Sequence, residues 1–206
     1  MLEAVDLECV RGSRRLFSGL SFRVARGSML WVLGPNGSGK TSLLRVLCGL
    51  VLPAAGGVRW CDEDVRVARD NFHVDLLYLG HAAAIKDDLS GRENLHFGLA
   101  QSGVVASASE VEAALREFGL SGREDLLARA LSQGQRRRVA LARLALAAGK
   151  RLWILDEPFN GLDADAVQLV QSHLVRQLER GGAAVLTSHQ EVDFGALPVQ
   201  RLPLAA

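Results

Sequence analysis

The residues with the clearest chemical meaning form a glycine-rich loop that ends in a lysine and a threonine. The loop fits the pattern G-x-x-x-x-G-K-[ST] and reads Gly34-Pro35-Asn36-Gly37-Ser38-Gly39-Lys40-Thr41, with Ser42 next in the chain. Glycines let the backbone adopt positive φ and approach a ligand, and the amides at a helix start attract phosphate. We expect Lys40 to reach the β- and γ-phosphates of a nucleotide and Thr41 to hold Mg²⁺. The alternative interpretation is a flexible Gly/Ser connection.

A pair of acidic residues, Asp156 and Glu157, is the second candidate group. It directly follows the apolar run 152–155, which has the length of a buried strand. A carboxylate at that position can hold Mg²⁺ directly or through water, and its neighbour can orient and deprotonate an attacking water. We therefore expect Asp156 to be a metal ligand and Glu157 to be the general base. The alternative is that both carboxylates only cap the strand.

The third group is Ser132-Gln133-Gly134-Gln135, which opens a helical pattern. The first amides of a helix lack intrahelical partners and carry the positive end of the helix dipole, so they suit a γ-phosphate. Taken alone, the same residues are more often an ordinary helix N-cap. The basic run 136–138 that follows is typical of a solvated or salt-bridged face rather than of a nucleic-acid surface.

Apolar runs predict the strands that position these groups. The run 29–33 leads into the phosphate loop, and the runs 75–80, 152–155 and 183–187 have the same continuous apolar character. Such runs are typical of parallel strands that are buried on both faces. A helix over 42–47 follows the loop. These elements predict an α/β core.

Near the N-terminus the pattern alternates instead. Val5, Leu7 and Cys9 alternate with acidic residues, and a second alternating run covers 20–24 after a polar turn over 11–19. Alternation of this kind predicts an antiparallel edge sheet with one wet face, to which 58–60 adds a strand.

From 82 to 130 the character becomes helical, and the face that repeats along 110–118 consists of Val111, Ala114, Leu115 and Phe118. We read 1–206 as a single domain. Residues 1–81 and 131–206 form the core with its antiparallel sheet, and 82–130 form an inserted α-helical subdomain.

The composition excludes several classes of function. The net charge of +1 gives no sign of a nucleic-acid partner. The three cysteines show neither zinc nor haem-attachment spacing. The longest mostly apolar run, 46–58, is too short to span a bilayer, and the N-terminus has no signal-peptide pattern. We expect any contact with a membrane to come through a partner.

In their order and spacing, these motifs resemble the ATP-binding-cassette (ABC) ATPase family across essentially the whole chain. The resemblance rests on the phosphate loop, the Leu131–Gln135 signature, the acidic pair at 156–157, the run 160–163 and the pair 188–189. It implies the fold of a P-loop NTPase of the ABC type, with ATP and Mg²⁺ clamped between the loop of one subunit and the signature of another. The chain has one of each, which implies a homodimer or a pairing with another cassette. The resemblance also implies that Asp163 lies on the dimer seam, and that His189 contacts the γ-phosphate and helps to hold the water and Glu157.

Two positions depart from the family pattern. His81 stands where the family commonly has a glutamine that contacts Mg²⁺ and water, and a neutral imidazole can keep part of that role. Arg11 aligns near the aromatic that usually stacks on adenine; a guanidinium can stack on a base, and a plain surface arginine is the alternative.

Further motifs resemble the ATP-binding subunits of cytochrome c maturation transporters, among them 79–81, 152–159 and 186–190. That resemblance implies two such subunits with two membrane-spanning subunits, peripheral on the cytoplasmic face of a bacterial inner membrane. Haem would be involved only indirectly, either as the exported substrate or on a chaperone that the complex releases. Two alternatives remain at this point: an ATPase subunit of another ABC transporter, or a soluble ABC ATPase that remodels a macromolecular complex.

Overall fold

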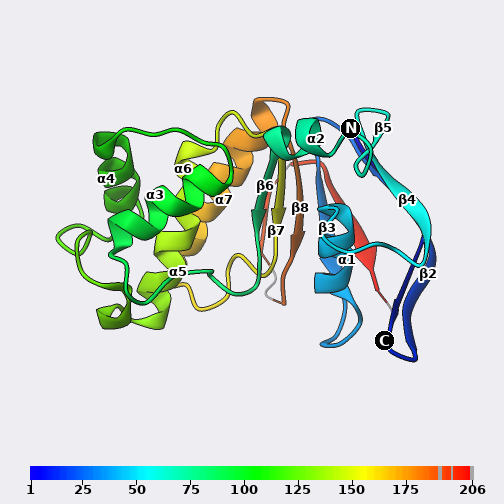
Figure 1. The fold of residues 1–206 in the computed structure, drawn as a ribbon, viewed down its shortest axis with the longest axis horizontal. Helices are drawn as coiled ribbons and strands as arrows, with labels where there is room; N and C mark the ends of the chain where they lie inside the picture. The colour runs from blue at the N-terminus through cyan, green and yellow to red at the C-terminus, as the bar shows by residue number, and fades with distance from the viewer. Residues whose placement is uncertain (190–191, 196, 205–206) are drawn as a thin grey trace.

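A five-stranded parallel sheet forms the centre of the molecule (Figure 1). The computed structural model describes residues 1–189, 192–195 and 197–204. The strand order is β6-β7-β8-β3-β9, and the strands are β3 (Met29–Leu33), β6 (Leu76–Leu79), β7 (Leu152–Leu155), β8 (Ala183–Thr187) and β9 (Val199–Pro203). All four apolar runs are confirmed as parallel strands. Strand β9 was not predicted, because its sequence has only two apolar side chains among polar ones and lies at the sheet edge.

An antiparallel sheet of order β2-β1-β4-β5 lies beside it, at the right of Figure 1. Its strands are β1 (Leu2–Arg11), β2 (Arg14–Val24), β4 (Ala55–Trp60) and β5 (Glu63–Asp64). The edge sheet and the strand over 58–60 are therefore confirmed. The predicted turn over 11–19 is wrong, because β2 already begins at Arg14. Polar residues there belong to an exposed strand that pairs along its length with β1.

The alternation predicted for β1 is wrong at one residue. Val5 is 41% exposed, whereas Leu2, Ala4, Leu7 and Cys9 are buried. The pairing register with both neighbouring strands shifts at this point, and Asp6 has a φ of 47°. Such a bulge inserts an extra residue and reverses the face on which the following side chains lie.

The helices divide between the two sides of the parallel sheet. Helix α1 lies between the two sheets, and α3 to α7 lie at the left of Figure 1. Three helices begin with a capping box, in which a serine and a residue three positions later satisfy each other's amides, at Ser90, Ser107 and Ser132. The bounds are α1 (Lys40–Leu47), α2 (Arg69–Asp75), α3 (Gly91–Gln101), α4 (Ala108–Glu117), a 3₁₀ turn (Ala128–Ala130), α5 (Gln133–Leu141), α6 (Arg143–Leu146) and α7 (Ala164–Glu179).

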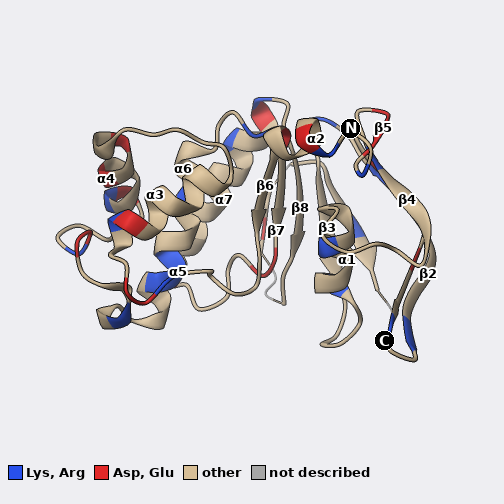
Figure 2. Cartoon of the chain, in the orientation of Figure 1, with Lys and Arg blue, Asp and Glu red and all other residues tan. Residues whose placement is uncertain are grey.

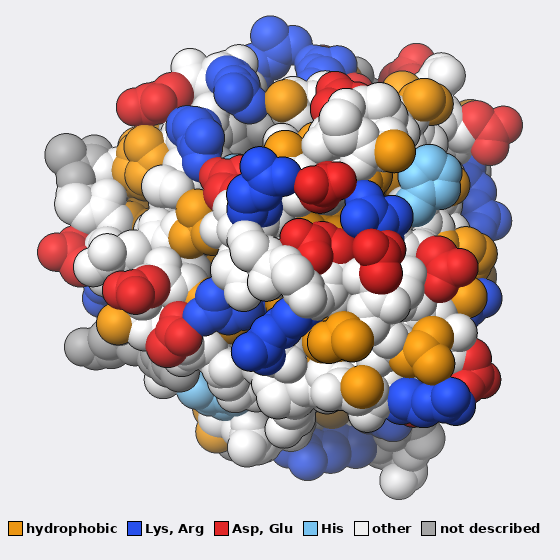
Figure 3. Space-filling model, turned by 90° about the vertical axis from the view of Figure 1, so that its left-hand side faces the viewer, with side chains coloured by type: hydrophobic (Ala, Val, Ile, Leu, Met, Phe, Trp, Pro, Cys, Tyr) orange, Lys and Arg blue, Asp and Glu red, His pale blue; other side chains and the backbone are white. Residues whose placement is uncertain are grey.

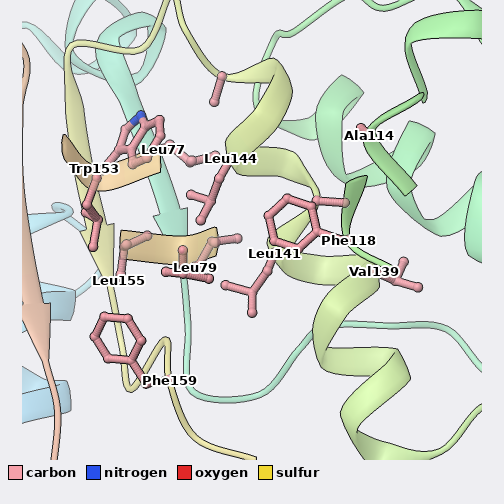
Figure 4. Close-up of a cluster of buried hydrophobic side chains, with 14 of the residues drawn as sticks. Leu77, Leu79, Ala114, Phe118, Val139, Leu141, Leu144, Trp153, Leu155 and Phe159 are labelled. Atoms are coloured by element: carbon pink, nitrogen blue, oxygen red, sulfur yellow. The ribbon is translucent and has the colours of Figure 1, made fainter. Parts of the chain in front are cut away.

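Two hydrophobic clusters cover the two faces of the parallel sheet. Alternate residues of β7 face opposite ways: Trp153 and Leu155 pack with the helical side, and Ile154 packs with the side of α1. Figure 4 shows the first cluster, where strand residues meet Leu141 of α5 and Phe118. The helical side therefore shares one core with the sheet, and the predicted face along 110–118 is buried as expected. The division at 82 and 130 stays a prediction, since α5 and α6 also pack against α3 and α4.

Strands β3, β6, β7 and β8 of the parallel sheet carry no charged side chain, whereas charged residues are spread over the helices, the loops and the antiparallel sheet (Figure 2). The acidic pair directly follows β7. On the face of the helical side shown in Figure 3, acidic and basic side chains are interspersed and form no continuous basic patch. Within the described ranges, no helix has the length and apolar character that crossing a bilayer requires.

Candidate active site

The phosphate loop joins β3 to α1 through three glycines with positive φ. Gly34, Gly37 and Gly39 have φ values of 150°, 81° and 99°. Gly34 is also packed closely, because a Cβ at that position would lie 2.7 Å from the carbonyl oxygen of Leu204. Only glycine meets both conditions without strain. The loop conformation therefore depends on the glycines of the motif and on the chain just after β9.

Lys40, the first residue of α1, is buried and points back across the loop. Its Nζ donates hydrogen bonds to the carbonyl oxygens of Gly34 at 2.7 Å and Pro35 at 3.2 Å. The ammonium group is thus held within the turn, close to the first amides of the helix. A cation and free helix amides in one place form a site for phosphate oxygens.

A cavity of about 260 Å³ brings predicted residues together from five parts of the chain. Its wall includes Lys40 and other loop residues, together with Arg11, His81, Glu157 and His189. The loop residues in the wall are Asn36, Gly37, Gly39, Lys40, Thr41 and Ser42. Gly34, Pro35, Ser38 and Asp156 do not line the cavity. Parallel strands place their carboxyl ends at one edge, which explains why segments distant in sequence meet there.

Asp156 lies just behind this cavity and is 1% exposed. Its Oδ1 accepts a hydrogen bond of 2.7 Å from the Thr187 hydroxyl at the end of β8. Its other carboxylate oxygen, Oδ2, is buried and has no hydrogen-bond partner among the described residues. Buried carboxylate oxygens are normally paired, so an unpaired one next to a phosphate loop fits a cation ligand. Within the described residues there is no cluster of three His, Cys, Asp or Glu side chains that could hold a metal.

Glu157 and His189 contact each other at two points, one an ion-pair contact between the side chains and the other a backbone hydrogen bond. His189 Nε2 lies 3.1 Å from Glu157 Oε1, and the His189 backbone amide donates to Glu157 Oε2 at 3.1 Å. The Glu157 side chain is 9% exposed, whereas that of His189 is 49% exposed. The carboxylate is therefore fixed in orientation at the cavity wall by a residue that reaches solvent.

The signature segment, Ser132 to Gln135, lies outside the cavity at the phosphate loop. Ser132 is the N-cap of α5, and its hydroxyl and the Gln135 side chain close a capping box. Ser132 and Gln133 are exposed, while Gly134 and Gln135 are half-buried. None of the four residues lines the cavity at the phosphate loop. The N-cap interpretation of the segment is therefore confirmed, and its role as a ligand site stays a prediction.

Asp163 occupies the N-cap of α7, where its Oδ1 accepts a hydrogen bond from the Ala166 amide at 3.0 Å. Its Oδ2 pairs with Arg138 Nη2 of α5, and the Asp163 side chain is 63% exposed. The pKa of this carboxyl is lowered, first by the Ala166 amide and further by Arg138. Asp163, the predicted seam residue, is therefore linked by an ion pair to the signature helix α5 of the same chain.

Comparison with known proteins decides the family. Residues 17–160 match the family model described as ABC transporter. The chain belongs to the ABC transporter family.

Relatives and solved structures agree with that assignment. Over 203 residues the chain is 51% identical to the cytochrome c biogenesis ATP-binding export protein CcmA of Nitrosospira multiformis, covering 98% of each chain. A solved ATP-binding subunit of an ABC transporter is 25% identical, with a TM-score of 0.80 over 91% of this chain and 79% of the other. A dimeric ATP-binding cassette solved in a post-hydrolysis state with ADP and Pi has a TM-score of 0.78 at 20% identity, over 92% and 88% of the two chains. The chain is an ABC-type ATPase domain.

Two residues with close contacts to this ABC site were not found from the sequence. Thr187 accepts the Glu157 amide hydrogen bond at 2.8 Å in addition to its bond to Asp156. The second is Arg137, which is buried. The interpretation of 136–138 as a solvated or salt-bridged face is therefore wrong for Arg137. It is right for Arg136 and Arg138, which form ion pairs. The end of an apolar strand could have indicated Thr187. No sequence signal separates Arg137 from its neighbours.

Proposed function

We propose that this chain hydrolyses ATP as the nucleotide-binding subunit of an export complex in c-type cytochrome biogenesis. The observation that carries the proposal is the single cavity in which the phosphate loop, Glu157 and His189 meet. The biological assignment is supported by the 51% identity to a relative named as an ATP-binding export protein of cytochrome c biogenesis.

In the proposed reaction the loop amides and Lys40 bind the phosphates of ATP and neutralise the charge that develops on the γ-phosphate. Glu157 accepts the proton of the attacking water. Its carboxylate is already oriented by His189, whose remaining exposed surface is available to the γ-phosphate. The general base therefore needs little reorganisation when ATP binds, which is the condition for effective proton transfer.

Mg²⁺ would be held by the Thr41 hydroxyl and Asp156, with His81 nearby in the cavity wall. Bound there, the ion would neutralise charge on the β- and γ-phosphates. Asp156 suits this role because its Oδ1 is fixed by Thr187 and its Oδ2 has no partner among the described residues.

The second half of each site would come from another copy of the chain. Ser132 to Gln135 lie outside the cavity at the phosphate loop, with exposed residues at the start of α5. A homodimer that places these helix amides against the γ-phosphate of the partner's ATP would complete both sites. Asp163 would then lie on the seam, since it already joins α5 to α7. A dimeric cassette of the same fold supports this arrangement.

Two membrane-spanning subunits would complete the complex on the cytoplasmic face of a bacterial inner membrane, with this chain peripheral to it. A groove of about 660 Å³ between the segment 79–84 and the helical side is a suitable docking place. His81 lines both this groove and the cavity at the phosphate loop. Haem would be involved only through the membrane subunits, and no nucleic-acid partner is expected.

Deletion and replacement of the gene test the biological role. We expect a deletion strain to lose c-type cytochromes, and expect the parent chain but not the Glu157→Gln chain to restore them. The chain should sediment with membranes only when its membrane partner is present. Normal c-type cytochromes in the deletion strain would favour another ABC transporter, and co-sedimentation with ribosomes would favour a remodelling ATPase.

A further inference from the structure

Arg137 is the one buried member of the basic run on α5, with 8% of its surface exposed. Arg136 pairs with Asp87 and Arg138 pairs with Asp163, both at the molecular surface. Successive residues of a helix point about 100° apart, so three consecutive arginines must face three directions. Only the Arg137 side chain is directed at the parallel sheet.

The Arg137 guanidinium donates hydrogen bonds to four backbone carbonyls. Nη1 contacts the oxygens of Gly80 and His81, each at 3.3 Å, and Nη2 contacts those of Asp156 at 3.1 Å and Glu157 at 2.7 Å. These carbonyls follow β6 and β7, which are neighbours in the sheet. One side chain therefore joins the ends of two strands to the signature helix.

Burial of this guanidinium has an electrostatic cost that its surroundings offset. Desolvation lowers the pKa of Arg137, while the charges of Asp156 and Glu157 act in the opposite direction. An arginine is almost never buried without partners. The four carbonyls use the Nη1 and Nη2 donors, and the two carboxylates supply the opposite charge, while the Nε donor is buried without a hydrogen-bond partner among the described residues.

The backbone of Glu157 adopts a conformation that needs such support. Its φ of 51° lies in the left-handed region that non-glycine residues rarely adopt. Its amide donates to Thr187 Oγ1 at 2.8 Å, and its carbonyl accepts from Arg137 at 2.7 Å. The strained peptide is thus fixed from both sides, and strain of this type persists only where the surroundings determine it.

We infer that Arg137 is a positioning residue that holds Glu157 in its strained conformation and connects the signature helix to Glu157 and the His81 segment. The inference rests on the proposed function, in which Glu157 activates water and α5 meets the partner's ATP. If α5 shifted when the signature binds nucleotide, Arg137 would move with it and would displace the segments that follow β6 and β7. Loss of Arg137 should therefore impair the chemical step and leave the phosphate loop intact.

The test compares Arg137→Met and Arg137→Lys in the complex purified with its membrane partner. We expect Arg137→Met to lower kcat roughly 10- to 100-fold, the range for residues that orient a reacting group through another. KM for ATP and the affinity of the chain for a fluorescent ATP analogue should change less than about twofold, because Lys40 and the loop amides are untouched. Arg137→Lys should recover part of kcat, since an ammonium can reach some of the four carbonyls.

Arg116→Met is the matched control, because Arg116 is an exposed arginine on α4 that pairs only with Glu112 among the described residues. It should keep the parent kcat. Glu157→Gln is measured in parallel. Parent-like turnover in Glu157→Gln would refute the proposed function itself, whereas an inactive Glu157→Gln with a parent-like Arg137→Met would refute only the role of Arg137. Equal losses of kcat and nucleotide affinity, or failure of both Arg137 variants to fold, would also overturn it and indicate a purely structural role.

Discussion

The two sides of the parallel sheet differ in how much of the site each completes. On the side of α1 and the strand ends, the phosphate loop, Glu157 and His189 already share one cavity, and Glu157 is oriented by a direct contact. On the helical side, the signature residues begin α5 at the surface and line no part of that cavity. One side brings the predicted phosphate-binding and water-activating residues together in one cavity, and the other side has the predicted signature at an exposed helix start.

This difference indicates which ATP contacts could favour closure of a dimer. A ligand shifts an equilibrium between open and closed dimers only through contacts made in one state and not in the other. The contacts of the loop are available in a single chain, whereas those of the signature would form only when a second chain closes on ATP. If the proposed dimer is right, the signature contacts would therefore stabilise its closed state, and the residues in the cavity would carry out hydrolysis.

Removal of the proposed general base should have the largest effect. Glu157→Gln keeps the shape of the side chain and loses the proton acceptor, so we expect the ATP hydrolysis rate of the complex to fall about 10²- to 10⁴-fold. Binding of ATP should persist, and a nucleotide-bound dimer should accumulate on size-exclusion chromatography. Hydrolysis at the parent rate would remove Glu157 from the mechanism.

Mixing two inactive variants tests whether the two halves of a site belong to different chains. Lys40→Ala damages the loop and Ser132→Arg blocks the signature, so each homodimer has two defective sites. In a mixed dimer one site carries both defects and the other carries none, and about a quarter of the parent rate should return at equal mixing. No recovery in phosphate-release assays would mean that loop and signature of one chain act together. The double variant, which should stay inactive, is the control.

Replacement of Thr187 tests how far the prepared side depends on its inner hydrogen bonds. Thr187→Val keeps the volume but leaves the Glu157 amide and Asp156 Oδ1 without this partner. We expect the free energy of unfolding to fall by about 1–3 kcal/mol, the cost of unsatisfied buried polar groups, and kcat to fall with it. Urea unfolding and steady-state kinetics measure both. Thr187→Ser should stay close to the parent, and an equally large loss in that variant would contradict the hydrogen-bond explanation.

A pH effect on stability should arise on the helical side. His173 of α7 is stacked on Phe118 and lies 3.0 Å from Glu117. Burial lowers the pKa of His173 below its usual 6.5, with Arg176 and Arg180 acting the same way and Glu117 opposing them. The unfolded chain then binds the proton more readily than the folded chain, so the free energy of unfolding should decrease as pH falls below about 6.5.

His173→Phe should flatten that part of the profile, by at most about 1.4 kcal/mol per pH unit, the value for one proton. Urea unfolding at a series of pH values between 5 and 7 measures the slope. An unchanged slope in the variant would assign the pH dependence to other groups.

The smallest expected effect concerns the base of the nucleotide. Arg11 lines the cavity as an exposed side chain, and stacking of an exposed guanidinium is worth about 0.5–1 kcal/mol. Arg11→Ala should therefore raise KM for ATP about two- to fivefold and leave kcat unchanged. An unchanged KM would show that Arg11 is a plain surface residue. KM for GTP, measured alongside, shows whether the contribution depends on the base.

Much of the fold and of the site could be predicted from local patterns. The apolar runs that became β3, β7 and β8 were found with their bounds, because continuous hydrophobicity of that length fits strands buried on both faces. The Asp6 bulge could not be found, since it depends on pairing with two other strands. Strand β9 could not be found either, because its place is set by β3 rather than by its own sequence.

The sequence by itself determined the chemistry of this protein: a phosphate loop, an acidic pair at a strand end and a signature at a helix start, each defined by residues close together in the chain. The tertiary structure decided which of these groups meet. It placed His189 against Glu157, put the signature outside the cavity and turned Arg137 alone of three arginines toward the strand ends. The physical reason is that residue type and spacing fix local geometry, whereas the groups that a side chain contacts are decided by the elements packed around it.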